Sequence, residues 1–182
     1  MTDTPDFYLE QIEAVKRTKS TRLVFRSPSR FGNPSDSEIE AANSNLSRIP
    51  KEIHELTWLK HLDMSRTTFK SSSGSRFGTR PLETFNFDSL SSLQNLESLS
   101  VSVEASSIDL STLRHLKKLR ELIIRGHFDE ISRDIGNITS LRTLNLKTST
   151  FNARLDRYLD SIGNLTKLDY LILEGSFIRL PD

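Results

Sequence analysis

One segment occurs five times in nearly the same form, and this repetition constrains the fold more than any other feature. Residues 136–146 read GNITSLRTLNL, and residues 163–173 read GNLTKLDYLIL. Segments 54–64, 91–101 and 114–124 also fit the pattern x-x-Φ-x-x-L-x-x-L-x-Φ, in which Φ is Leu, Ile, Val or Met. Repetition of this kind predicts a stack of similar units, each too small to bury its own apolar side chains.

The last two apolar positions of each segment alternate with other residues, and this alternation predicts a strand. A sixth, degenerate copy is TRLVF at 21–25. The expected apolar pairs of the strands are Leu23/Phe25, Leu62/Met64, Leu99/Val101, Leu122/Ile124, Leu144/Leu146 and Leu171/Leu173. The last four pairs follow one another at spacings of 23, 22 and 27 residues. Such spacings suit units of one strand and one return segment.

The pattern resembles the leucine-rich-repeat family from about residue 20 onward. Residues 46–65, LSRIPKEIHELTWLKHLDMS, are similar to the subtype with L-x-x-L-P-x-x-I-x-x-L units, which occurs in intracellular bacterial and plant proteins. The resemblance implies an α/β fold: a right-handed leucine-rich-repeat solenoid with a parallel concave sheet and short helices and turns on the convex side. We expect two such helices at 51–56 and 159–164. The resemblance also implies protein–protein recognition.

The sequence departs from the family where an asparagine normally follows the strand. The five positions hold Thr67, Glu104, His127, Ser149 and Ser176. Hydroxyl groups both donate and accept hydrogen bonds, so serine and threonine can replace part of what asparagine does. Glutamate and histidine fit this place less well, and we expect an irregular coil at Glu104 and His127.

We predict that residues 1–20 form an N-terminal capping helix. Thr4 is the expected N-cap, and Tyr8, Ile12 and Val15 fall on one face of the helix. Such a helix would cover the apolar end of the stack.

Residues 21–182 are expected to form the repeat domain of about six strands, with long loops near 26–45 and 70–88. No matching cap is recognisable at the C-terminal end, where the sequence reads FIRLPD. Two interpretations follow: the chain is a fragment of a longer protein, or the last turn is covered by another body. A homodimer through this uncapped end is therefore an expectation.

Composition argues against several classes of function. The chain has 25 Lys plus Arg against 24 Asp plus Glu, so its net charge of +1 provides no general attraction to nucleic acid or anionic membranes. It has no cysteine, and its four histidines lack the spacing of metal ligands. No apolar run is long enough to span a membrane. We therefore expect a non-catalytic protein without a cofactor. We place it inside the cell (cytoplasmic), with delivery into a host cell by a signal-less route as an open alternative.

Binding to another protein is the remaining function. In each strand, the residues beside the apolar pair should point to the concave face. Both long loops contain Ser-Arg-Phe-Gly followed by a proline, and we hypothesise that these loops bind a partner together with the concave face. The candidate partner-binding residues are Arg30, Phe31, Arg76, Phe77, Ile123, Arg125, Lys147, Tyr170 and Ile172.

The size of the sheet limits this hypothesis. Six strands of five residues give a concave footprint of about 400 Å², against about 800 Å² per partner in a standard interface. The sheet alone is therefore expected to bind weakly or with help from the loops. The two phenylalanines could instead be local core.

Two other functions stay open. The chain could be the recognition part of a larger signalling enzyme or bacterial effector, of the GTPase or ubiquitin ligase type. It could also be a weak nucleic-acid binder through a basic stripe, which would comprise Arg22, Arg26, Arg66, Arg125 and Lys147.

Overall fold

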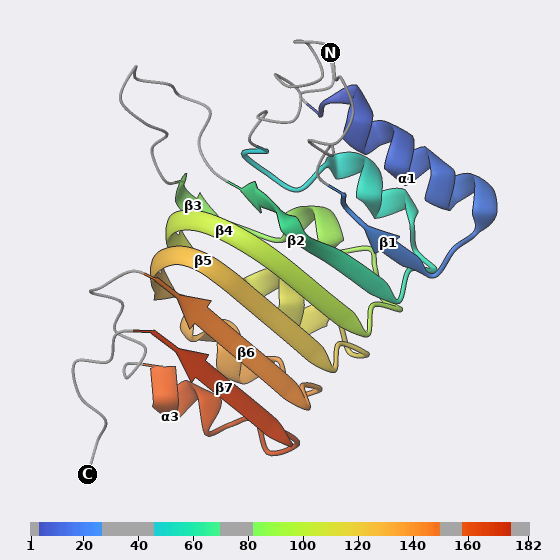
Figure 1. Cartoon of the computed structure of the whole chain (residues 1–182). Coiled ribbons are helices and arrows are strands. Elements are labelled where there is room, and N and C mark those ends of the chain that lie inside the picture. The colour runs from blue at the N-terminus through green and yellow to red at the C-terminus, as the bar shows by residue number, and fades with distance from the viewer. Residues whose placement is uncertain (1–3, 27–45, 70–81, 150–157, 176–182) are drawn as a thin grey trace, which may run out of the picture.

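Parallel strands from successive repeats lie side by side in one twisted sheet (Figure 1). The computed structural model describes residues 4–26, 46–69, 82–149 and 158–175. The strands are β1 (Arg22–Val24), β2 (His61–Phe69), β3 (Leu82–Phe85), β4 (Ser98–Ile108), β5 (Glu121–Ile131), β6 (Thr143–Thr148) and β7 (Tyr170–Glu174). Their order in the sheet is β1-β2-β4-β5-β6-β7, and β3 pairs with the second half of β4. The expected parallel solenoid sheet is confirmed.

The repeated leucines occupy one row across the sheet. Leu23 pairs with Leu62, which pairs with Leu99, and the row continues through Leu122 and Leu144. It ends at Leu171 of β7. The row forms because each strand has one apolar face, and a shift of one residue would move that face into solvent. The spacing of the leucines in the sequence therefore predicted the register.

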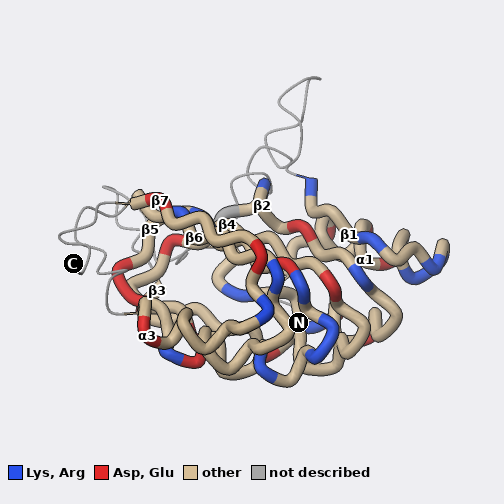
Figure 2. Tube along the Cα trace, turned by 90° about the horizontal axis from the view of Figure 1, so that it is seen from below, with Lys and Arg blue, Asp and Glu red and all other residues tan. Residues whose placement is uncertain are grey.

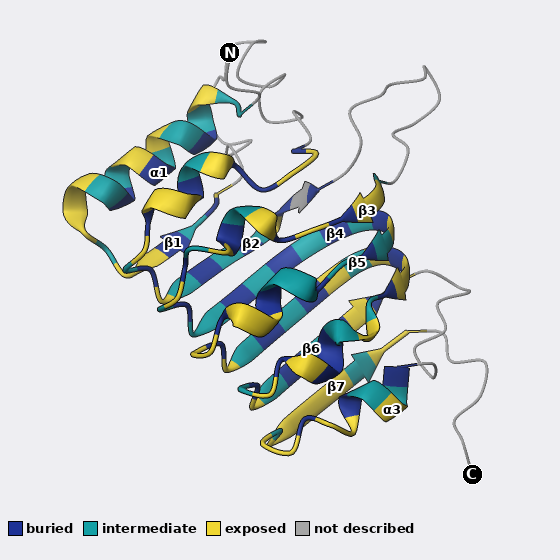
Figure 3. Cartoon of the chain, turned by 180° about the vertical axis from the view of Figure 1, so that it is seen from behind, coloured by how far each residue is buried: buried dark blue, intermediate teal, exposed yellow. Residues whose placement is uncertain are grey.

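Short helices return the chain along the convex side of the sheet (Figure 3). They are the 3-10 helices η1 (Lys51–Glu55), η2 (Asp88–Leu90), η3 (Ser111–His115) and η4 (Arg133–Asn137), and the α-helix α3 (Leu159–Ile162). The helices expected at 51–56 and 159–164 are present and end one or two residues earlier. Between helix and strand, the two apolar residues of each Φ-x-x-L step are buried, as at Leu93 and Leu96, except in the last step, where Leu165 is buried and Leu168 is half-buried.

The helix α1 (Asp6–Thr18) covers the N-terminal end of the sheet. Tyr8, Ile12 and Val15 are buried, as expected, against the core that includes Phe25. The prediction that Thr4 caps this helix is wrong. Pro5 is the N-cap and makes no side-chain cap hydrogen bond, because its ring carries no hydrogen-bonding group. The hydroxyl of Thr4 instead donates to Oε2 of Glu52 in η1, at 3.2 Å.

The sheet turns a corner where β4 and β5 run on past the usual end of a repeat strand. Each has eleven residues, and Glu104 pairs with His127 within an unbroken ladder. The irregular coil expected there is therefore wrong, because backbone pairing replaces the asparagine. Gly126 allows the close approach at this corner: its φ is 130°, and an added Cβ would lie 2.0 Å from the carbonyl oxygen of Val103.

Two buried threonines take over part of the bridging role expected of an asparagine. The hydroxyl of Thr148 accepts from the backbone N–H of Phe128 at 3.3 Å and donates to its carbonyl at 3.0 Å. This position is one residue before the expected Ser149. The hydroxyl of Thr67 donates to the phenol oxygen of Tyr8 at 3.4 Å, and so links β2 to α1.

Part of one expected long loop is a strand, and most of the rest of the two loops lies outside the described residues. The loop predicted at 70–88 is wrong for residues 82–85, which form β3. Phe85 of this strand is buried against Phe69 and Phe87, with ring centroids 5.0 and 5.2 Å away. The serine- and glycine-rich composition of residues 70–81 indicated a loop, and the strand that follows has only four residues. Residues 27–45 and 70–81 lie outside the described part of the chain.

Candidate functional site

The concave face of the sheet carries rows of side chains that the register defines. The first row comprises Arg22, His61, Ser98, Glu121, Thr143 and Tyr170. The middle row comprises Val24, Asp63, Ser100, Ile123, Asn145 and Ile172. A third, shorter row comprises Ser102, Arg125, Lys147 and Glu174. These residues alternate with the buried leucines, as the sequence predicts.

A bulge in β2 changes the third row from what the sequence indicates. The register shifts between Met64 and Thr68, so Thr68 rather than Ser65 pairs with Ser102. A carboxylate oxygen of Asp63, Oδ1, accepts from the backbone N–H of Ser65 at 2.9 Å and from its hydroxyl at 2.6 Å. These two bonds close a local turn at the start of the bulge.

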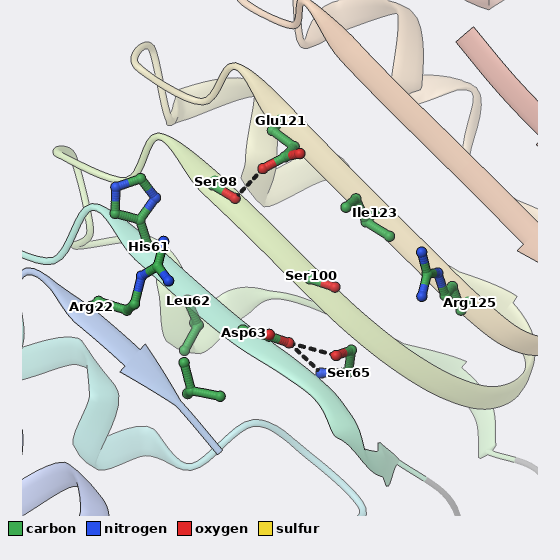
Figure 4. Close-up of a pocket in the computed structure, with 11 residues that line it drawn as sticks. Arg22, His61, Leu62, Asp63, Ser65, Ser98, Ser100, Glu121, Ile123 and Arg125 are labelled. Atoms are coloured by element: carbon green, nitrogen blue, oxygen red, sulfur yellow. Dashed lines mark hydrogen bonds between the residues drawn. The ribbon is translucent and has the colours of Figure 1, made fainter. Parts of the chain in front are cut away.

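The N-terminal half of this face encloses a hollow of about 420 Å³. Residues of β1, β2, β4 and β5 line it, and Figure 4 shows their side chains rising from the strands. The polar and charged lining residues are Arg22, His61, Asp63, Ser65, Ser98, Ser100, Glu121 and Arg125. A hollow with this lining suits a polar ligand better than an apolar one.

The acids of the hollow accept hydrogen bonds from neighbouring residues, whereas the arginines have no hydrogen-bond partner among the described residues. The hydroxyl of Ser98 donates to Glu121 at 2.5 Å, and Asp63 is held by Ser65 as described above. Within the described part of the chain, the guanidinium groups of Arg22 and Arg125 make no hydrogen bond or ion pair, and both residues are exposed. The two arginines therefore keep their donors available for a partner.

The C-terminal half of the face is more apolar. Tyr170 and Ile172 of β7 lie on this face and are 69% and 42% exposed, and Leu171, on the core side of the same strand, is 44% exposed; these are the large exposed hydrophobic side chains among the described residues. Inward from them, the side-chain oxygen of Asn145 is buried, and no described residue donates a hydrogen bond to it. An unsatisfied buried acceptor of this kind costs free energy until a donor reaches it.

The five described candidates from the sequence all lie in these rows. Ile123 and Ile172 are in the middle row, Tyr170 is in the first, and Arg125 and Lys147 are adjacent in the third. Lys147 forms an ion pair with Glu174 at 2.5 Å, so its positive charge is partly neutralised within the sheet. Arg30, Phe31, Arg76 and Phe77 lie outside the described residues.

The basic stripe proposed from the sequence does not form a continuous positive surface. Asp63 and Glu121 line the same hollow as Arg22 and Arg125, and Glu174 neutralises Lys147. Figure 2 shows Lys and Arg interspersed with Asp and Glu along the chain. The sequence reasoning missed this interleaving, although residues in one row of adjacent strands could have been compared position by position.

The described residues provide neither a metal site nor a membrane-spanning helix. They contain no group of three or more His, Cys, Asp or Glu side chains arranged to hold a metal ion. They also contain no helix that is long and apolar enough to cross a membrane.

Comparison with solved structures identifies similar folds. A leucine-rich-repeat protein from Leptospira interrogans is 22% identical over 75% of this chain and 37% of its own, with a TM-score of 0.50. The leucine-rich-repeat ectodomain of a plant membrane receptor kinase from Arabidopsis thaliana is 21% identical over 71% of this chain and 17% of its own, with a TM-score of 0.44. An internalin from Listeria monocytogenes is 15% identical over 94% of this chain and 76% of its own, with a TM-score of 0.28.

These likenesses concern the fold. The matches span less than half the length of the Leptospira and Arabidopsis chains. No protein-family model matches the sequence, and no curated protein does. The single row of leucines, the all-parallel sheet and the likeness to the Leptospira protein show that this chain is a leucine-rich-repeat solenoid with an N-terminal helix.

Proposed function

We propose that this chain is a non-catalytic recognition module that binds another protein through its concave face. The observation that carries the proposal is the pair of arginines, Arg22 and Arg125, which line one hollow with no partner among the described residues. Arginine and tyrosine are the residue types that most often dominate binding energy at interfaces. A sheet formed in advance also lowers the entropy cost of association.

Within this proposal, the two halves of the face have different roles. The hollow offers guanidinium donors for carboxylate or backbone carbonyl groups of the partner. The region around Ile123, Asn145 and Ile172 offers apolar contact and one buried acceptor. A partner segment lying across the strands would meet the polar half first and then the apolar half.

The test begins with affinity capture of a partner from the native cell and continues with the purified partner. The double variant Arg22→Ala with Arg125→Ala should weaken binding by about tenfold or more, as expected for the loss of interface anchors. A matched control removes two exposed positive charges away from the concave face, with Arg133→Ala and Lys167→Ala. An equal loss in both double variants, or no loss in the first, would contradict the proposal.

The duplicated loops are a separate part of the proposal. We infer from the repeated Ser-Arg-Phe-Gly segment that Arg30, Phe31, Arg76 and Phe77 extend the binding surface beyond the sheet. Replacement of all four by alanine should lower the affinity for the same purified partner. Unchanged affinity would remove the loops from the binding surface and leave the concave face as the site.

The charge pattern disfavours nucleic acid as the partner. Two acids, Asp63 and Glu121, line the same hollow as the arginines, and they would repel a phosphate backbone. A gel-retardation assay at two salt concentrations measures this directly, because nucleic-acid binding falls steeply with salt. A role as the recognition part of a larger signalling enzyme stays a prediction, and the reading frame beyond Asp182 tests it.

A further inference from the structure

Strand β7 has an exposed apolar surface and an outer edge that no described strand pairs with. It pairs with β6 on one side only, and no described strand follows it in the sheet. Leu171 continues the row of buried leucines, yet it is 44% exposed, and the neighbouring Ile172 is 42% exposed. An apolar edge strand of this kind is a template for pairing with another strand.

The direction of the backbone groups in β7 follows from its ladder with β6. The N–H of Tyr170 donates to the carbonyl of Arg142 at 2.9 Å, so the backbone groups of Tyr170 point toward β6. Successive residues of a strand point their N–H and C=O groups to opposite sides. Ile172 and Glu174 therefore also point inward, and Leu171 and Leu173 direct their N–H and C=O groups to the outer edge.

This edge is complementary to a second copy of itself. In an antiparallel pair centred on Ile172, Leu171 lies opposite Leu173 of the second copy, and these two residues exchange both of their outward hydrogen bonds. Opposite residues share one face of the sheet, so leucine meets leucine on the core side. On the concave side, Ile172 meets Ile172, and Tyr170 meets Glu174 of the second copy. No like charges face each other.

We propose that two copies of this chain associate through β7, which pairs antiparallel with β7 of the second copy about a two-fold axis at Ile172. The pairing covers Leu171 and Ile172 and satisfies the outward backbone groups of Leu171 and Leu173. It joins the two sheets into one. The gain for function rests on the proposed recognition of a partner by the concave face. In the dimer, the concave footprint would grow from about 400 Å² to about 800 Å², the size of a standard interface.

The chain permits a direct test by cross-linking, because it contains no cysteine of its own. Ile172 would form a non-hydrogen-bonded antiparallel pair, with its Cα about 4.5 Å from that of its counterpart, which is within disulfide range. The Ile172→Cys variant should therefore form a dimer linked through one disulfide under mild oxidation. A mixture of Tyr170→Cys and Glu174→Cys chains should give the mixed dimer. Tyr170→Cys alone or Glu174→Cys alone should cross-link far more slowly, because the two cysteines of such a dimer would lie about 13 Å apart.

The second measurement is the mass in solution, by sedimentation equilibrium of the cysteine-free chain. We expect a species of twice 20.8 kDa with a micromolar dissociation constant. Ile172→Lys should raise this constant at least tenfold, because two positive charges would meet at the axis. Ile123→Lys is the matched control, since it makes the same change in the same row two strands inward and should leave the dimer intact.

A monomer at about 100 μM, a concentration that populates any micromolar dimer, would overturn the proposal and indicate that another segment or another protein covers β7. Equal cross-linking of Tyr170→Cys with itself and with Glu174→Cys would also overturn it, because the antiparallel register would then be absent. Neither measurement needs the binding partner. Failure of the dimer and failure of the proposed recognition function are therefore distinguishable.

Discussion

The two ends of the solenoid place the same repeat position in opposite environments. At the N-terminal end, Leu23 of β1 is 2% exposed, and Tyr8, Ile12 and Val15 of α1 join it in the same core. At the C-terminal end, Leu171 of β7 is 44% exposed, although it lies in the same row. A repeat leucine is therefore buried by its neighbouring units. The repeat sequence alone does not determine its burial.

Hydrogen bonds and an ion pair also hold α1 against the first repeats at the N-terminal end. Lys16 of α1 pairs with Glu55 of η1 at 2.9 Å, and Thr67 of β2 bonds to Tyr8 of α1. The indole N–H of Trp58 donates to the carbonyl of Ser20, and the ammonium of Lys19 lies 3.9 Å from the centre of the Trp58 ring. Polar and apolar contacts thus fasten α1 to the first repeats.

The largest effect should come from placing a charge in each end. Ile12→Asp buries an unpaired carboxylate in the cap and should lower the free energy of unfolding by about 4 kcal/mol or more. Ile172→Asp makes the same change at the exposed end and should cost less than about 1 kcal/mol. Urea denaturation at low chain concentration measures both. Similar losses would mean that β7 is as well covered as α1.

The next largest difference in stability is expected between leucine-to-alanine changes at the two ends of the leucine row. Leu23→Ala removes a buried side chain and should cost about 3 kcal/mol. Leu171→Ala should cost about 1 kcal/mol or less, because a side chain that is almost half exposed loses less transfer free energy. The difference between the two losses is the measured quantity, again from urea midpoints. Equal losses would show that Leu23 and Leu171 are buried to the same extent.

A smaller effect concerns the hydroxyl that links sheet and cap. Thr67→Val keeps the shape of the side chain and removes its hydrogen bond to Tyr8, which should cost about 1 kcal/mol. Tyr8→Phe removes the other partner of the same bond. A double-mutant cycle between the two tests their coupling, and full additivity would show that the bond contributes nothing.

The smallest effect is the pH dependence of the ion pair that ties α1 to η1. Hydrogen bonding to Lys16 lowers the pKa of Glu55 below its usual 4.5. Hydrogen bonds to Glu13 and then Glu55 raise the pKa of Lys16 above 10.5. The contribution of Glu55 is present above pH 4.5 and is lost as the pH falls through its folded pKa. That of Lys16 is present below pH 10.5 and is lost as the pH rises through its folded pKa.

Glu55→Gln tests this pair. The difference in urea midpoint between the natural chain and the variant should be constant between these two limits and should shrink at both acid and alkaline pH. Because the Glu55 side chain is exposed, salt should also reduce the difference. A difference that stays constant from acid to alkaline pH would show that the ion pair does not hold the cap.

The sequence predicted the features that depend on periodicity. The spacing of Leu99, Leu122 and Leu144 fixed the register, because only one face of each strand is apolar. The same alternation placed Ile123, Arg125, Lys147, Tyr170 and Ile172 on the concave face. The apolar face of α1 was predictable for the same physical reason, since its buried residues recur at helical spacing.

The features that the sequence did not predict depend on contacts between units. The bulge at Asp63 and Ser65 depends on a local side-chain turn, and β3 depends on pairing with the extended end of β4. The exposure of Leu171 depends on what lies beside β7, and no described strand does. None of these contacts leaves a periodic signal in the sequence.

Residue-resolved hydrogen exchange can show whether the burial and pairing of each strand come from the neighbouring unit. In the Ile172→Lys variant, which keeps the edge of β7 free of a second copy, the amides of Leu122, Ile123 and Ile124 in β5 should all be protected. In β7 protection should alternate, with Ile172 and Glu174 slow and Leu171 and Leu173 fast. Uniform protection along β7, equal to that of β5, would contradict the account.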